Sequence, residues 1–345
     1  MKPDHALVCL QPGPHASLVS QALPQPRLGR HQVLVRVTAT SINPIDTKRA
    51  QGYGRRLLGL IGAGGNAVVL GNDFAGHVVA VGPQATPYKV GDQVYGVLPT
   101  GRAGGAHKST LVADARYLRP LPKDLDPAAA SVLPYTFCTL WQAFSGLGLD
   151  ANRVKDQHIL VHGGSGALGQ MAIQVLAQWG GHVTATCSAA HADLCRSLGA
   201  ETVVDRHQTR ITELPAHFDV TLNFGSWSDD AQLVTRLRHG AIGHATTVHP
   251  LMSELDQHGW LRGLLRLLSQ WRHMRKLVKE KGPQTRYAWV LFKPSPDALD
   301  TLAELLRQDH IHLDIAMRVP FSKARRAFQH VANGSPQRAV LLPNA

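Results

Sequence analysis

The sequence predicts an α/β protein of two domains, one rich in β-strands and one built on a doubly wound parallel sheet. Its 345 residues exceed what one ordinary core organises. Residues 6–97 consist of short apolar runs broken by glycine and proline, a pattern typical of strands. Residues 157–186 run from an apolar strand through glycines into helix formers and then into a second strand, which is the order of a βαβ unit.

The glycine-rich stretch 157–170, QHILVHGGSGALGQ, predicts a dinucleotide site. Its glycines fit G-x-G-x-x-G, where the first makes a tight turn, the second admits a pyrophosphate and the third lets helix and strand pack closely. A glycine-rich turn without a ligand is the alternative, and the position between strand and helix favours the dinucleotide. The predicted phosphate-binding residues are Gly164, Ser165, Gly166, Ala167, Leu168 and Gly169.

Composition limits the class of protein. The chain is 44% hydrophobic and has no apolar run near the ~20 residues of a membrane span. Its formal net charge of +12 suits nucleic acid, an anionic membrane surface or an anionic ligand, but RNA-binding aromatic signatures are missing. The four cysteines are scattered and indicate reduced thiols. The first ten residues lack a targeting signature, so a cytoplasmic location is expected.

Three stretches in the first half resemble a known family. They are ATSINPIDTK at 39–48, the Gly-Tyr-Gly at 52–54 and LGNDFAGHVVAVG at 70–82. Together they are similar to the zinc-independent, quinone oxidoreductase-like medium-chain dehydrogenase/reductases. The resemblance implies a GroES-like β-rich domain at 1–127 and 294–345, and a Rossmann domain at 128–293.

The resemblance also implies that no catalytic metal is present. Asn72 stands where the zinc enzymes of this superfamily have a histidine ligand, and 41–43 offer no cysteine. Catalytic zinc needs about three protein ligands.

The family comparison favours NADPH as cofactor. The strand at 183–188 ends without the acid that binds a ribose 2′-hydroxyl, and Ser188 stands there instead. Arg206 follows the next strand and can pair with a 2′-phosphate, or it is only a solvated surface charge. In similar enzymes, further contacts come from the later strand ends and from the C-terminal return. The corresponding residues are Asn223, Val248, Val290, Phe292, Ser335 and Arg338.

Residues 261–281 predict a basic amphipathic helix. Leu261, Leu264, Leu265, Leu268, Trp271, Met274 and Val278 share one face, with arginines and lysines largely opposite. The helix either packs on its own domain or forms a lid or membrane-surface element.

The function that the resemblance implies is NADPH-dependent reduction of a quinone. Asn43 and Thr139 would orient nicotinamide and substrate, and Tyr53 would donate a hydrogen bond or proton. The alternatives without a catalytic role are that Tyr53 only caps a loop and that the Thr139 hydroxyl only bonds the backbone of its own helix. Reduction of an α,β-unsaturated aldehyde or ketone is a rival reaction, and an NADPH-holding interaction or sensor protein is a rival of another class. A homodimer is also expected from similar enzymes.

Overall fold

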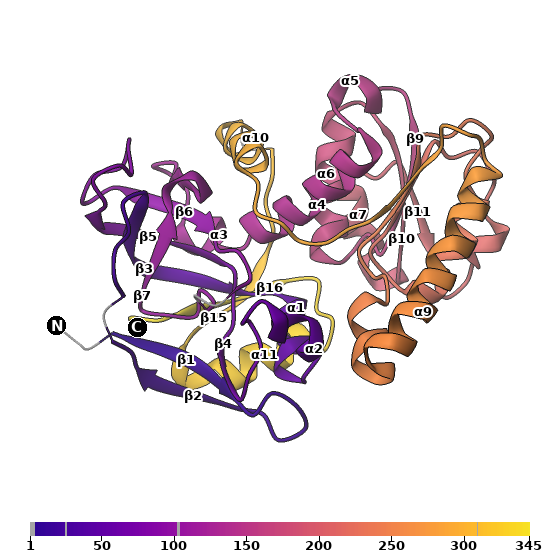
Figure 1. Ribbon diagram of the computed structural model, residues 1–345. Helices are drawn as coiled ribbons and strands as arrows, with labels where there is room; N and C mark the ends of the chain where they lie inside the picture. The colour runs from indigo at the N-terminus through magenta and orange to yellow at the C-terminus, as the bar shows by residue number, and fades with distance from the viewer. Residues whose placement is uncertain (1–3, 25, 102–103, 309) are drawn as a thin grey trace. The chain divides into compact units, whose positions relative to one another are not determined.

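The computed structural model describes residues 4–24, 26–101, 104–308 and 310–345. The chain forms two compact units, Met1–Cys138 with Pro294–Ala345 (unit 1) and Thr139–Lys293 (unit 2). The sequence predicted changes of unit after residues 127 and 293. In the structure the first change follows residue 138, inside a helix, and the return follows residue 293. The chain therefore leaves its β-rich unit, completes the parallel-sheet unit and returns (Figure 1).

Unit 1 is built on two sheets. The larger one has the order β15-β16-β3-β5-β6-β8, with β7 also pairing with β3, and the smaller one has the order β2-β1-β4. In β3, Val33, Val35 and Val37 are fully buried while the residues between them are not, as a strand with one face on a core requires. The strands are β1 His5–Leu10, β2 Ser17–Ala22, β3 Gln32–Ile42, β4 Ala67–Val69, β5 Asp73–Val81, β6 Gln93–Val97, β7 Thr110–Asp114, β8 Leu118–Pro120, β15 Ile315–Pro320 and β16 Arg338–Leu342.

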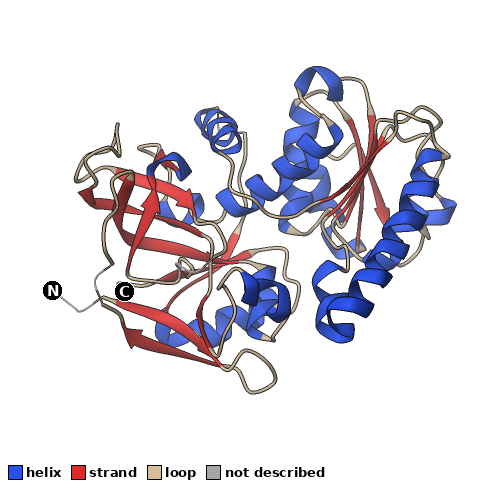
Figure 2. Ribbon diagram, in the orientation of Figure 1, coloured by secondary structure: helices blue, strands red, loops and turns tan. Residues whose placement is uncertain are grey.

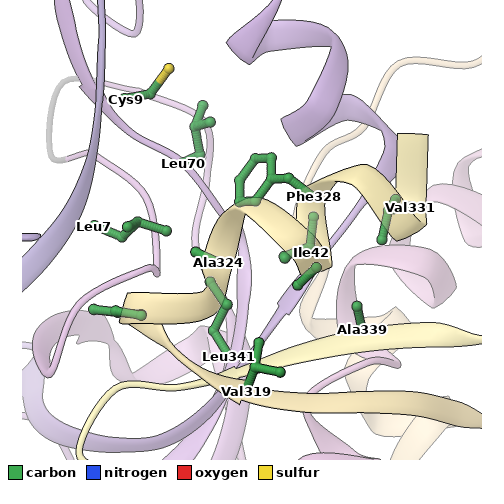
Figure 3. Close-up of a cluster of buried hydrophobic side chains, with 12 residues drawn as sticks. Leu7, Cys9, Ile42, Leu70, Val319, Ala324, Phe328, Val331, Ala339 and Leu341 are labelled. Carbon is green, nitrogen blue, oxygen red and sulfur yellow. The ribbon is translucent and has the colours of Figure 1, made fainter. Parts of the chain in front are cut away.

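The C-terminal segment completes a core of unit 1. Helix α11 (Ala324–Ala332) turns Phe328 and Val331 toward strands from the start of the chain (Figure 3). Ile42 of β3 and Leu341 of β16 belong to the same buried cluster, and these two strands pair antiparallel. The last residues therefore hold β3 in place, and β3 ends one residue before Asn43, the first predicted catalytic residue. The other helices of this unit are α1 Pro44–Ala50, α2 Arg55–Leu60, α3 Pro127–Ala130 and α10 Pro296–Arg307.

Unit 2 is a doubly wound sheet with the strand order β11-β10-β9-β12-β13-β14, and every neighbouring pair is parallel. Helices lie on both of its faces (Figure 2). The strands are β9 His158–His162, β10 His182–Cys187, β11 Thr202–Asp205, β12 Val220–Asn223, β13 Gly243–Thr246 and β14 Arg286–Trp289. The helices are α5 Ala151–Val154, α6 Ala167–Gln178, α7 Ala192–Ser197, α8 Asp230–Thr235 and α9 Leu251–Lys279, while α4 Pro134–Leu147 spans the change of unit.

The helix expected at 261–281 differs from its prediction in extent and in burial. It begins at Leu251 and is kinked at Gly259, whose φ of 73° and ψ of −178° are not helical. Its packed face carries Leu267, Met274 and Val278, whereas Leu261 and Leu265, expected on that same face, are exposed. The predicted single apolar stripe is therefore wrong for the first half of the helix. None of the described helices is long and apolar enough to cross a membrane.

Candidate cofactor and active site

The loop between β9 and α6 is a turn built from glycines. Gly163, just before the predicted motif, has a φ of +85° and so occupies the conformation that favours glycine. The Gly164 N–H donates to the Thr186 carbonyl at 2.9 Å, which ties the loop to the end of β10. The tight turn that the motif assigns to Gly164 thus begins one residue earlier.

The other three glycines have different physical reasons. A Cβ at Gly169 would lie 2.2 Å from the Gly163 carbonyl oxygen, and one at Gly164 would lie 2.9 Å from the Ala185 Cβ. Both are therefore required by packing. A Cβ at Gly166 would meet nothing closer than 3.5 Å, and its φ of −73° suits any residue. Packing within the protein therefore does not require glycine at position 166. A phosphate that approached the backbone here would require it, because a side chain would occupy its space.

The start of α6 supplies donors at this place. Ala167, Leu168 and Gly169 form its first turn, so their amides have no carbonyl partner within the helix, and Gly166 offers no side-chain cap. The helix holds because alanine, leucine, glutamine and methionine are strong helix formers. The positive end of its dipole and the open space at Gly166 fit a pyrophosphate.

The next two strands end beside this loop. The Arg206 N–H donates to the Cys187 carbonyl at 2.9 Å, so the residue after β11 lies next to Ser188, the residue after β10. Ser188 Oγ lies 3.0 Å from His191 Nδ1, and the Arg206 side chain is exposed. The two residues predicted to read the 2′-phosphate are therefore neighbours at the same edge of the sheet.

Asn223, at the end of β12, belongs to a buried polar network. Its amide donates to the Ser226 carbonyl and to Asp230 Oδ1, both at 2.8 Å, and its oxygen accepts from the Gly225 N–H at 3.1 Å. Asp230 also bonds His244 at 2.8 Å and accepts from the Tyr287 hydroxyl at 3.1 Å. Burial alone would raise the pKa of Asp230, but His244 and its other partners lower it. Asn223 is fully buried, so it shapes the 223–226 turn.

Val248 and Val290 come together at the ends of β13 and β14. The Val290 N–H donates to the Thr246 carbonyl at 2.9 Å, and the Val248 N–H donates to Thr246 Oγ1 at 3.4 Å. His249, which the sequence did not single out, donates from Nε2 to the Val290 carbonyl at 3.0 Å and stacks on Trp289. Phe292 lies two residues further on, outside the strand, and is half-buried.

Unit 1 holds a second polar group, the buried polar cluster of Asn43, Asp46, Asp73 and Arg338. Asn43 Nδ2 donates to Asp73 Oδ1 at 2.9 Å, and Arg338 Nη2 donates to Asn43 Oδ1. Asp46 Oδ2 accepts from the Asn43 N–H at 2.8 Å. Asn43 is 1% exposed and Arg338 is 4% exposed. The amide of Asn43 and one nitrogen of the Arg338 guanidinium are therefore engaged inside the unit, while Arg338 Nε is buried without a hydrogen-bond partner.

Burial sets the charge balance of this cluster. It raises the pKa of Asp73 to about 7, although the neighbouring Arg338 lowers it, and Asp46 adds to the rise. Burial likewise lowers the pKa of Arg338, against the pull of the two carboxylates.

Comparison with known proteins identifies the family. Residues 29–123 match the model of the alcohol dehydrogenase GroES-like domain, and residues 198–337 match a model named zinc-binding dehydrogenase. The human NAD(P)H oxidoreductase RTN4IP1, mitochondrial, is 31% identical over 318 residues, covering 88% of this chain and 79% of the relative. The chain belongs to the zinc-independent medium-chain dehydrogenase/reductases. The predicted family and the predicted fold class are confirmed. The family consists of oxidoreductases that use NAD(P)H, as the name of the human relative states.

Two solved structures share the fold of this medium-chain dehydrogenase/reductase. The quinone oxidoreductase from Coxiella burnetii superposes with a TM-score of 0.79 at 21% identity, covering 99% of this chain and 100% of that one. The CurK enoyl reductase gives 0.78 at 19% identity, with 99% of both chains covered.

The remaining predicted residues of this dehydrogenase/reductase are placed as follows. Tyr53 is half-buried, with Lys48 Nζ 5.7 Å from its ring centre. Ser335 lies in the loop before β16 and is half-buried. Thr139 lies in α4 at the first residue of unit 2 and is 6% exposed. Each unit thus contains part of the predicted site residues. Their catalytic roles remain predictions.

The position that holds a histidine ligand in zinc enzymes is used differently in this medium-chain dehydrogenase/reductase. Asn72 Nδ2 donates to the Leu98 carbonyl at 2.9 Å and to Thr100 Oγ1 at 3.2 Å. Among the described residues no group of three histidines, cysteines or acids is placed to hold a metal ion.

The expected cytoplasmic location is contradicted, because the human relative and its counterparts in other animals are named as mitochondrial proteins. The expectation rested on the composition of the first ten residues, which by itself carries no information about the compartment.

Proposed function

We propose that this chain is an NADPH-dependent oxidoreductase that reduces a quinone. The observation that carries the proposal is the open phosphate cradle at Gly166 together with Ser188 and Arg206 at the neighbouring strand ends. The cradle fits a pyrophosphate. Ser188 and Arg206 fit a 2′-phosphate, and no acidic residue stands at the end of β10 to repel it. Family membership adds the reaction class.

The residues of this chain bind the cofactor and orient it against the substrate. The first-turn amides of α6 hold the pyrophosphate, and Arg206 and Ser188 hold the 2′-phosphate. When bound, the nicotinamide supplies the hydride, which goes to the conjugated carbonyl system of the substrate. Tyr53 donates a hydrogen bond or a proton to the oxygen on which negative charge develops. Thr139 orients the reactants, and Asn43 keeps its backbone in place through the buried polar cluster, so positioning lowers the barrier.

Cofactor choice tests the first half of this proposal. Fluorescence titration should show NADPH binding at least about tenfold tighter than NADH, or about 1.4 kcal/mol. Arg206→Ala should weaken NADPH binding selectively, because only NADPH carries the 2′-phosphate. Arg210→Ala, at an exposed arginine paired with Glu213, is the matched control and should change neither affinity. Equal losses for both cofactors in Arg206→Ala would show that the side chain does not read the 2′-phosphate.

The substrate is tested by following NADPH oxidation with a panel of quinones and of α,β-unsaturated aldehydes and ketones. Faster turnover of quinones supports the proposal, and turnover confined to the unsaturated carbonyls selects the enone reductase alternative. NADPH binding without turnover of either class would select the interaction or sensor protein. Tyr53→Phe, which removes only the hydroxyl, should lower kcat while leaving the affinity for NADPH unchanged.

We further propose a homodimer formed through β14, because this strand is the outer one of the unit 2 sheet and pairs on one side only with β13. Light scattering during size-exclusion chromatography tests the stoichiometry. Trp289→Pro, which removes a backbone N–H on the side of the strand that does not pair with β13, should shift a dimer toward monomer.

A further inference from the structure

Helix α9 exposes an apolar surface that its own unit does not cover. Leu261 is 76% exposed, Leu265 61%, Leu264 52%, Leu268 41% and Trp260 38%. These five residues, the α9 apolar patch, occupy the first turns after the kink at Gly259, in the long orange helix of Figure 1. We propose that this patch docks the protein on an anionic lipid surface.

The patch is a second stripe, separate from the one that packs. Gly263, Leu267, Met274 and Val278 are buried and hold α9 on its unit, with Met274 and Val278 in a cluster with Val234 and Leu237. Residues 261, 264, 265 and 268 repeat at the spacing of three and four that puts side chains on one face of a helix. Since the packed face is already complete without them, these leucines are available to another surface.

The charges around the patch select an anionic partner. Between residues 261 and 279 the sequence has six arginines and lysines and no aspartate or glutamate. Arg266 forms an ion pair with Glu254, with 2.6 Å between Arg266 Nε and Glu254 Oε2. The other five, among them Arg262, Arg272 and Lys276, form no ion pair with a carboxylate of the described residues. Apolar side chains followed by uncompensated cations on one helix are the pattern of helices that lie in a lipid interface.

A second copy of this chain fits the patch less well. In a two-fold dimer the same surface lies on both subunits, so two stretches 261–279, each with six arginines and lysines and no aspartate or glutamate, would lie close together. An anionic lipid headgroup region instead accepts the leucines among its acyl chains and neutralises the cations. The described helices cannot span the bilayer, so the contact is with its surface.

The experiment is cosedimentation of the full chain with vesicles of phosphatidylcholine alone and of phosphatidylcholine with phosphatidylglycerol. Binding should be at least tenfold stronger to the anionic vesicles and should fall as salt rises, because salt screens the charges. Leu261→Ser/Leu265→Ser should lose it. The matched control is Leu60→Ser/Val90→Ser, which replaces two residues that are each 66% exposed elsewhere and should bind like the wild type.

A second pair of variants tests the charges. Arg272→Gln/Lys276→Gln should weaken binding to anionic vesicles, whereas Arg325→Gln/Arg326→Gln, with the same loss of charge on exposed positions of α11, should not. Equal weakening in both pairs would assign the binding to net charge and overturn the proposal. So would wild-type protein that ignores anionic vesicles, or a patch variant that only lowers the subunit number, since that result assigns the patch to a second copy.

The docking proposal does not rest on quinone reduction. NADPH oxidation with a small water-soluble quinone should be unchanged in Leu261→Ser/Leu265→Ser, so a failed enzyme assay and a failed vesicle assay are separate results.

Discussion

The carboxyl edge of the unit 2 sheet and the buried polar cluster of unit 1 use their polar groups in opposite ways. At the edge, the first-turn amides of α6 are without helical partners, Gly166 leaves open space, and Arg206 is exposed. In the cluster, Asp46, Asp73 and Arg338 each share a hydrogen bond with Asn43, and all four residues are almost fully enclosed. The edge is available to a ligand, whereas the cluster is committed to the fold.

This difference separates binding from stability. Substitutions at the edge should change affinity for the cofactor with little effect on folding, whereas substitutions in the cluster should change the free energy of unfolding first.

Removing the cation of the cluster should have the largest effect. Arg338→Leu removes the donor to Asn43 Oδ1 and the positive charge that favours ionisation of the buried Asp73, and uncompensated buried charge typically costs about 3–5 kcal/mol. The loss should be smaller at low pH, because Asp73 can then take a proton. Urea unfolding measures the change in the free energy of unfolding. The control is Arg325→Leu, at an exposed position of α11, which should change this free energy by no more than about 0.5 kcal/mol. A similar small change for Arg338→Leu would mean that the cluster is not a stabilising ion group.

The raised pKa of Asp73 predicts a pH dependence of stability. Burial lifts this pKa from 3.8 to about 7 in the folded protein. Between those values the folded state holds a proton that the unfolded state releases, so the free energy of unfolding should fall as pH rises through this window. One such group accounts for at most about 4 kcal/mol at 1.36 kcal/mol per pKa unit.

Asp73→Asn tests this dependence, because the amide keeps the shape of the side chain and cannot ionise. The slope of stability against pH between about 4 and 7 should become flatter in this variant. An unchanged slope would assign the titration to other groups. Asp124→Asn, at an aspartate outside the cluster, is the control and should keep the wild-type slope.

At the carboxyl edge, Gly166→Ala should impair the cofactor and spare the fold. Its Cβ would meet nothing closer than 3.5 Å, so the free energy of unfolding should change by less than about 1 kcal/mol. NADPH affinity should fall at least about tenfold, or about 1.4 kcal/mol, because the methyl group occupies the space of the phosphate. Gly169→Ala is the contrast: its Cβ would lie 2.2 Å from a carbonyl oxygen, so it should destabilise the fold by about 1–3 kcal/mol. Unchanged NADPH affinity in Gly166→Ala would remove the cradle from the site.

The sequence was informative where local spacing decides the structure. The glycine motif, the strand periods and the C-terminal return are patterns of neighbouring residues, and they predicted the family and the fold. The environments of Asn43 and Asn223 were not predictable in this way. Asn43 is paired with Arg338 and Asp73, and Asn223 with Asp230, and a pattern of residue types does not reveal such tertiary partners. Both asparagines were expected to face ligands, and both are bound inside their units.

Helix α9 shows the same limit for an amphipathic pattern. Periodicity correctly predicted a helix, but it could not tell which of two apolar stripes its unit covers. Leu267 and Leu265 differ by two positions, and the first is 5% exposed while the second is 61% exposed. Which stripe packs depends on α8, whose Val234 belongs to the cluster that contains Met274.

The smallest effect is expected from metal removal, and it tests how far the commitment of polar groups in unit 1 extends. Asn72 uses its amide N–H groups on Leu98 and Thr100, where zinc enzymes of the family have a histidine that binds the metal. Dialysis against a chelator should therefore leave both NADPH oxidation and the free energy of unfolding unchanged, with elemental analysis as the measure of bound metal. Asn72→His offers the sharper comparison, because it restores one ligand where about three are needed, so added zinc should not increase activity. Zinc bound in a one-to-one ratio in the wild type, with turnover lost on its removal, would show that this unit has an open metal site after all.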